Sequence, residues 1–328
     1  MCLSGDLPVF ARGPPFFAIK SRRLEPAWQS SRSPFERWFR ESVKAHRGAE
    51  LNGLTRRETQ MSGAGVSVKH FNFGRTTRRD AWWAQPALVF VGLSAFLAYA
   101  TWAGLQGDHY FFGNYLSPFY SPVLFGDSPH RWLAGSRPGW WPTWLLWSPA
   151  FLIIWAPAGF RVTCYYYRGA YYKAFWADPP SCTVGEPRSH YRGERSFPLI
   201  LQNVHRYFLY LALAFIVILG SDAWHAMWFA DPLTGKEVFG VGVGTIVLTI
   251  NVVLLAGYTF GCHSLRHLIG GRLDRLSGAR VQQTAYNCVS CFNRVHMGWA
   301  WPSLFFVAFS DLYVRLCSMG LLSDWRLF

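Results

Sequence analysis

Charged residues are scarce in this chain of 328 residues, at 15%, whereas 51% of the residues are hydrophobic and 18% are aromatic. Soluble domains average about 25% charged residues. So little charge argues against an ordinary soluble domain and favours a membrane protein.

Cofactor fingerprints are also missing. The sequence lacks the Gly-rich dinucleotide motif and the clustered cysteines of an iron–sulfur relay. Cys288 and Cys291 form a C-x-x-C pair, but residue 292 is Phe, so the pattern for covalent haem attachment is absent. We interpret this pair, and also Cys164, Cys182 and Cys262, as ordinary reduced thiols on the cytoplasmic side. The alternative is a zinc or iron–sulfur site at the C-x-x-C pair, which would need about four ligands and which a third cysteine such as Cys182 or a histidine would have to complete.

Long apolar runs are what the sequence has instead. A helix needs about 20 apolar residues to cross the hydrocarbon layer. Five runs reach that length, over approximately residues 84–106, 141–167, 197–220, 239–263 and 297–322, and the second of them is broken by Pro149 and Pro157. We predict an all-α fold, an integral membrane bundle of five transmembrane helices over residues 84–322, with a short C-terminal tail at 323–328.

The connecting segments predict the orientation, because Lys and Arg are retained on the cytoplasmic side. Side A, formed by residues 61–83, 156–198 and 261–296, holds 15 basic and 5 acidic residues. Side B, formed by 105–142, 221–238 and the tail, holds 4 basic and 6 acidic residues. Side A is therefore predicted to be cytoplasmic. The net charge of +14 reflects this topology and the N-terminus, so no nucleic-acid partner is expected.

Residues 1–60 differ from the rest. They hold 11 basic and 6 acidic residues, scattered prolines and serines, and no apolar periodicity, which predicts a disordered N-terminal extension. Met61 is the first methionine after Met1, so one interpretation is a mis-assigned start. An Arg-rich targeting peptide is the other. Residues 61–83 are expected to form a cytoplasmic lead.

Histidines lie at similar depth on three predicted spans of side A. His205 is early in the third span, His263 and His267 end the fourth, and His296 opens the fifth. A b-type haem needs two imidazoles from two helices at one membrane level. We predict His205, His263 and His296 as iron ligands and His267 as a hydrogen-bonding partner. Helix capping or headgroup contact is the alternative for any single histidine.

Arginines next to these histidines have a predicted role as well. Arg206 and Arg266 are close enough in sequence to pair with haem propionates through the fork geometry of the guanidinium group. Haem binding and propionate pairing would offset the cost of placing ionisable groups in an apolar span.

Side B gives a weaker signal. His109 and His225 lie at predicted helix ends and could serve a second haem. Asp311 and Arg315 are four residues apart within the fifth span, so they share a helix face. They are predicted to face a second haem or a polar cavity, and a structural ion pair is the alternative.

Several motifs resemble the cytochrome b membrane anchors of succinate dehydrogenase and fumarate reductase, of the large single-chain bacterial type. "QNVHRYF" (202–208) resembles the His-Arg stretch of an anchor helix, and "HSLRHLIGGRLD" (263–274) resembles the Arg-His-Leu motif. The resemblance covers roughly residue 79 to the C-terminus. It departs at Phe260, where the family has its usual ligand, and His263 takes that role in our interpretation.

The resemblance implies a division of labour. Flavoprotein and iron–sulfur subunits would dock on the cytoplasmic face and oxidise succinate, and this chain would not touch succinate itself. It would anchor the complex in membrane lipid, ligate one or two b haems and bind quinone, with Arg206, Tyr207 and Arg266 as hydrogen-bond donors. The implied location is the bacterial inner (plasma) membrane, as a multi-pass protein with a cytoplasmic N-terminus.

Two alternatives remain open at this point. A transporter or channel could use the same ionisable residues to line a path, although no internal repeat relates the spans. The chain could also be the haem b anchor of another quinone-linked oxidoreductase.

Overall fold

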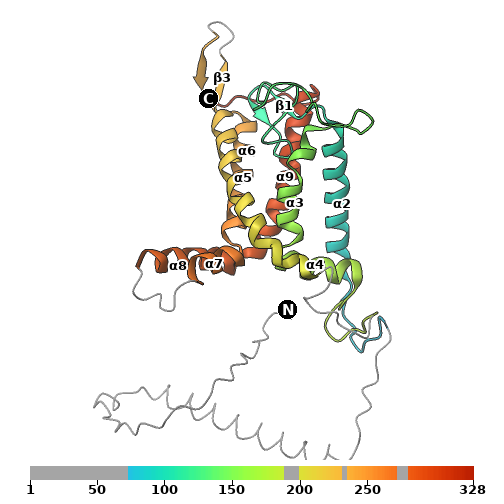
Figure 1. Ribbon diagram of the computed structural model, residues 1–328. Coiled ribbons are helices and arrows are strands. Elements are labelled where there is room, and N and C mark those ends of the chain that lie inside the picture. The colour runs from blue at the N-terminus through green and yellow to red at the C-terminus, as the bar shows by residue number, and fades with distance from the viewer. Residues whose placement is uncertain (1–72, 188–198, 231–234, 272–279) are drawn as a thin grey trace, which may run out of the picture. The chain divides into compact units, whose positions relative to one another are not determined.

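The computed structural model describes residues 73–187, 199–230, 235–271 and 280–328. The predicted extension 1–60, and most of the predicted lead 61–83, lie outside the described residues. The described chain forms a mostly helical bundle (Figure 1), as the sequence predicts. All statements below refer to this part of the chain.

Three helices are long and apolar enough to cross a membrane, over 84–106, 200–225 and 243–260. The first is α2 (Ala84–Gln106), which has the bounds expected from its apolar run. It ends where Gly107 adopts a left-handed conformation with φ of 69°, as glycine readily does at a helix C-terminus. The other two are α5 (His205–His225), which follows the short helix η3 (Leu199–Val204), and α6 (Val243–Phe260).

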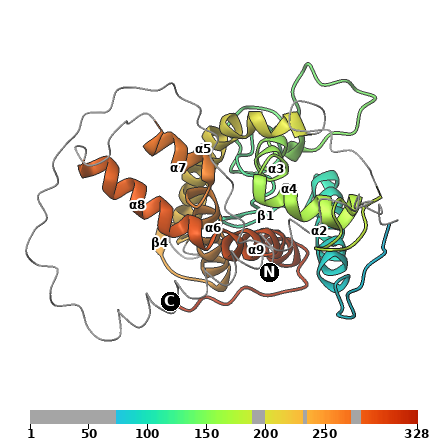
Figure 2. The ribbon, with the colours of Figure 1, turned by 90° about the horizontal axis from the view of Figure 1, so that it is seen from below.

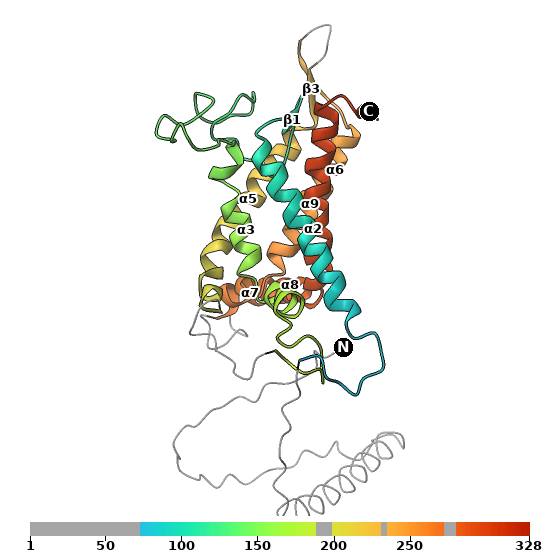
Figure 3. The same cartoon turned by 90° about the vertical axis from the view of Figure 1, so that its right-hand side faces the viewer.

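A fourth long helix, α9 (His296–Ser318), has the same length as α2, 23 residues. It is less apolar because Asp311 and Arg315 lie within it. Both are buried, so the charges face the bundle. Figure 3 shows α2 alongside α9, and the two helices are in contact.

The second predicted span, over 141–167, is broken near Pro149 and Pro157 as expected, but its first eight residues are not helical. Residues 141–148 are not helical, Pro149 opens a one-turn helix, η1 (Pro149–Leu152), and α3 (Trp155–Val162) follows. Proline lacks a backbone N–H and is best tolerated in the first turn of a helix. Pro149 and Pro157 both occupy such first turns, so they divide the run into short helices.

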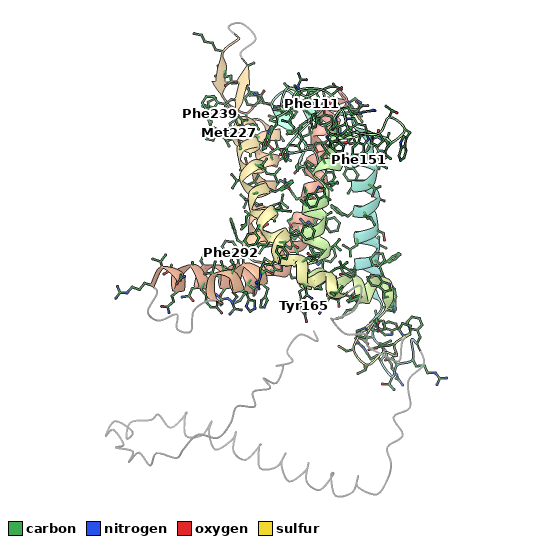
Figure 4. The ribbon with its side chains drawn as sticks, viewed as in Figure 1. Phe111, Phe151, Tyr165, Met227, Phe239 and Phe292 are labelled. Carbon is green, nitrogen blue, oxygen red and sulfur yellow. The ribbon has the colours of Figure 1, made fainter. Side chains whose placement is uncertain are left out.

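The two ends of the bundle differ in structure. At the side B end are two antiparallel hairpins, β1 (Phe111–Phe112) with β2 (Tyr115–Leu116) and β3 (Trp228–Ala230) with β4 (Glu237–Phe239). The labelled Phe111, Met227 and Phe239 lie there in Figure 4, whereas Tyr165 and Phe292 lie at the opposite, side A end.

Short helices cover the side A end. They are α4 (Tyr165–Tyr171), the π-helix η2 (Tyr172–Trp176), α7 (His263–Gly270) and α8 (Arg280–Arg294). The α7–α8 pair and α4 extend to opposite sides of the bundle (Figures 1 and 2). Two sharp bends make this possible. Cys164 and Cys262 have extended backbones between a bundle helix and the short helix that follows it.

Candidate functional site

His205 opens α5 and is directed into the bundle, with 7% of its surface exposed. Its ring stacks on Phe160 of α3 at 4.7 Å between centroids. Its Nδ1 atom lies 2.8 Å from the hydroxyl of Thr163. Its Nε2 atom lies 3.1 Å from the sulfur of Cys262. Both ring nitrogens therefore have polar neighbours inside an apolar core.

The contact with Thr163 fixes the tautomer of His205. Thr163 donates its hydroxyl hydrogen to the carbonyl of Gly159 at 2.7 Å, so towards His205 it acts as an acceptor. The histidine must then carry its proton on Nδ1 and donate it to Thr163. This leaves a lone pair on Nε2, directed at Cys262. A metal-ligating imidazole is held in the same way by its other nitrogen.

His296 is placed similarly at the start of α9. Its ring stacks on Tyr258 of α6 at 5.0 Å, and its Nε2 atom lies 3.8 Å from the sulfur of Cys164. Its Nδ1 atom is buried without a hydrogen-bond partner among the described residues. A Cβ atom on Gly261 would come within 2.9 Å of this nitrogen, so glycine is needed for the close approach.

Two His–Cys pairs thus meet in one buried region, which we call the His–Cys cluster: Cys164, His205, Cys262 and His296. Cys164 and Cys262 belong to one cluster of buried side chains, together with Phe160 and Tyr258. Cys164 and Cys262 are only 4% and 2% exposed, and both are free thiols. Among the described residues, no three His, Cys, Asp or Glu converge on a point that could hold a single metal ion. The donors form two pairs instead.

A porphyrin does not fit between these two histidines. His205 contacts Phe160, the ring of Phe160 lies 5.5 Å from Tyr258, and Tyr258 contacts His296. Phe160 and Tyr258 are both almost fully buried. Aromatic side chains therefore occupy the space between the imidazoles.

Comparisons with known proteins support the expected family. The family model described as "Actinobacterial succinate dehydrogenase subunit SdhC" matches residues 84–320. The chain belongs to this family. It is thus an SdhC-type membrane subunit of a succinate dehydrogenase complex. The sequence had left open a transporter and another quinone-linked oxidoreductase, and the comparison supports succinate dehydrogenase.

A solved structure agrees with the SdhC assignment. The chain is 40% identical to a chain of the Mycobacterium smegmatis Sdh1 complex in the apo form, with a TM-score of 0.69. The match covers 77% of this chain and 94% of that one. A search of curated proteins found no match.

The other side A residues predicted from the sequence lie outside the His–Cys cluster. His263 and His267 are exposed on α7, and their Nε2 atoms are 3.1 Å apart. Partial burial, followed by the charges of His267 and Arg266, lowers the pKa of His263. Arg206 and Tyr207 are exposed on α5. Arg266 lies over the ring of Tyr286, and its Nε is buried without a hydrogen-bond partner among the described residues.

On side B the two candidate histidines remain at the surface. His109 is exposed, and its Nδ1 lies 3.4 Å from the hydroxyl of Ser318. His225 is also exposed, and its Nδ1 lies 2.8 Å from the carbonyl oxygen of Ser221, one turn earlier in α5.

Asp311 and Arg315 form a buried ion pair, 3.3 Å between Nε and Oδ2. Tyr99 donates a hydrogen bond to Asp311 at 2.6 Å, and Ser117 donates another. Arg315 also donates to the carbonyl oxygen of Asp108 at 2.8 Å. Because these groups satisfy one another, the structure favours the structural ion pair.

Sequence reasoning missed Cys164 and Cys262 as site residues. Each lies within the last few residues of a predicted span and precedes an aromatic or histidine residue, in "FRVTCYY" and "YTFGCHS". The signal was the shared position of the two cysteines at side A, at the same level as His205 and His296.

Proposed function

We propose that this SdhC-type subunit transfers electrons from an iron–sulfur partner subunit to membrane quinone through a redox centre bound by the His–Cys cluster. The observation behind the proposal is the pairing of two buried cysteines with the buried His205 and the partly buried His296, from four separate segments. Succinate oxidation would belong to a flavoprotein partner, because this chain lacks a dinucleotide-binding motif.

The donor set favours an iron–sulfur cluster over haem b. Rieske-type clusters contain two irons, one held by two cysteines and the other by two histidines. The His–Cys cluster offers the same four donors, two sulfurs and two imidazoles, in one region, although each close contact joins a histidine to a cysteine. A porphyrin, by contrast, lacks room there. When bound, such a cluster would accept and release one electron at a time. Haem b, predicted from the sequence, is the second candidate. It would give sharp visible absorption bands instead of a Rieske-type paramagnetic signal.

The protein side chains would orient and shield the centre. The hydrogen bond from His205 Nδ1 to Thr163 leaves the lone pair of the imidazole on Nε2, which faces Cys262. Phe160 and Tyr258 cover the imidazole faces and exclude water. A dry, apolar shell and fixed ligand orientation are the means by which a protein sets a reduction potential.

Quinone would reach the centre from the lipid. Arg206 and Tyr207 follow His205 directly on α5 and are exposed, with Tyr207 at 70%. Both can donate hydrogen bonds to a quinone oxygen. Arg266 is the third candidate donor, because its buried Nε has no hydrogen-bond partner among the described residues.

The partner subunits would dock at the side A end, and side A would face the cytoplasm of a bacterial cell, with the N-terminus on the same side of the inner membrane. The excess of basic residues on side A supports this orientation. So do α4, α7 and α8, which extend across this end of the bundle.

The test is spectroscopy on the complex purified from membranes with this chain in place. The wild type is compared with a His205→Ala, His296→Ala double variant by electron paramagnetic resonance, visible absorption, and iron and sulfide analysis. We expect the variant to lose one Rieske-type signal, with its iron and sulfide, and to keep the partner's signals. Loss of sharp bis-histidine haem bands instead would favour haem b. Identical spectra would refute the proposal.

A further inference from the structure

We propose that Arg161 sets the reduction potential of the centre held by the His–Cys cluster, by placing a fixed positive charge beside it without acting as a ligand. This inference rests on the proposed function. Arg161 lies in the last turn of α3, between the ligand-bearing segments, and was not singled out from the sequence.

Hydrogen bonds hold the guanidinium group of Arg161 in one place. One nitrogen donates to the hydroxyl of Tyr167 at 2.8 Å and to the carbonyl oxygen of Ala300 at 3.4 Å. Another donates to the hydroxyl of Ser303 at 3.1 Å. The acceptors belong to α4 and α9, so the position of the charge is set by three elements.

Aromatic rings bring this charge close to the cluster. The guanidinium carbon of Arg161 lies 4.7 Å from the ring centroid of Tyr258 and 5.7 Å from that of Tyr167. Tyr258 in turn stacks on His296 at 5.0 Å. Arg161 is thus one ring away from a proposed ligand.

Arg161 takes part in neither of the ion pairs seen in the described part of the chain, Arg78 with Asp80 and Arg315 with Asp311. A cation inside a membrane bundle is costly unless something neutralises it. Two thiolate ligands with the sulfides of an iron–sulfur cluster would supply negative charge. The Tyr258 and Tyr167 faces offer only weak attraction by comparison.

The direction of the effect follows from charge. Each turnover step adds one electron to the centre from the iron–sulfur partner and later passes that electron to quinone, and no bond to Arg161 forms or breaks. The added electron makes the centre more negative, so a nearby positive charge stabilises the reduced form. Arg161 would therefore raise the reduction potential and favour electron entry.

A purely structural role is the competing explanation, because Arg161 also ties α3 to α9 through Ala300 and Ser303. Three variants of the intact complex separate the two roles. Arg161→Gln removes the charge and keeps hydrogen-bond donors. Arg161→Lys keeps the positive charge but loses the forked hydrogen-bond geometry of the guanidinium group. Ser303→Ala removes one hydrogen bond and keeps the charge.

The measurement is a redox titration of the complex followed by electron paramagnetic resonance. For Arg161→Gln we expect a lower midpoint potential, with a fall on the order of tenfold in the reduced-to-oxidised ratio at the wild-type midpoint. Arg161→Lys and Ser303→Ala should titrate near the wild type. An unchanged midpoint in Arg161→Gln, or an equal shift in Arg161→Lys or in Ser303→Ala, would overturn the inference.

A fourth variant covers the case in which Arg161→Gln fails to assemble. Ser303→Asp places a carboxylate beside the intact guanidinium group, so it should neutralise the charge and lower the midpoint in the same direction. An unchanged midpoint there would also reject the role of Arg161. Absence of any signal dependent on His205 and His296 in the wild type would instead reject the proposed function.

Discussion

The imidazole Nε2 of His205 and the sulfur of Cys262 lie 3.1 Å apart, although 57 positions separate the two residues along the chain. This contact exists because α5 begins and α6 ends at the same level of the bundle. It places a soft thiol donor against an imidazole in a dry core, a combination that suits iron–sulfur clusters.

Replacing either buried cysteine should remove the centre. Cys262→Ser keeps the size of the side chain but provides a much weaker ligand for iron, so nearly all of the signal lost in the double histidine variant should be lost here too. Cys288→Ser is the matched control, because Cys288 is an exposed free thiol on α8. Iron and sulfide analysis with electron paramagnetic resonance is the measurement. Equal loss in the control would contradict the assignment.

Thr163 should matter through His205 alone. Thr163→Val keeps the shape but removes the acceptor for the Nδ1 proton, and comparable changes around metal ligands cost about 10–100-fold in metal affinity or activity. Thr163→Ser retains the hydroxyl and should behave like the wild type. The measurement is the rate at which a chelator removes iron from the complex, and equal rates in all three proteins would show that this hydrogen bond is unimportant.

The ion pair between Asp311 and Arg315 should stabilise the fold without affecting the centre. Asp311→Asn leaves a buried guanidinium without its counter-charge, and breaking such a pair costs about 3–5 kcal/mol. Thermal unfolding in detergent should show the loss, while the redox signal per folded complex stays unchanged. Replacing both residues, as Asp311→Leu with Arg315→Met, should recover part of the stability. A changed redox signal would instead link this pair to electron transfer.

Gly257 should not tolerate a side chain. An added Cβ would lie 2.5 Å from the indole ring of Trp299, so Gly257→Ala should force α6 and α9 apart at a cost of about 1–3 kcal/mol. Gly220→Ala is the control within α5, since nothing lies within 4 Å of its Cβ position. That change should be neutral or stabilising, by up to about 1 kcal/mol. Thermal unfolding of both variants measures the difference, and similar losses would contradict the packing argument.

The sequence predicted the helices whose apolar runs are uninterrupted. α2 has the bounds of its run, and α6 and α9 differ from theirs by a few residues. Pro149 and Pro157 also indicate where the run at 141–167 is broken, because proline interrupts backbone hydrogen bonding, but the apolar composition of 141–148 does not show that this part is not helical. The inward placement of His205 was also foreseen, because an ionisable residue in an apolar span must face the protein interior.

By itself the sequence determined the membrane class and the charge difference between the two ends, and it indicated His205 as a candidate site residue. These features depend on composition and on the spacing of residues that are close in sequence, so they do not require knowledge of the packing. Only the tertiary structure decided that Cys164, Cys262 and His296 join His205 while His263 and His267 stay at the surface. That outcome depends on how far each helix extends and on the rotation of each helix about its axis, and packing between segments distant in sequence sets both.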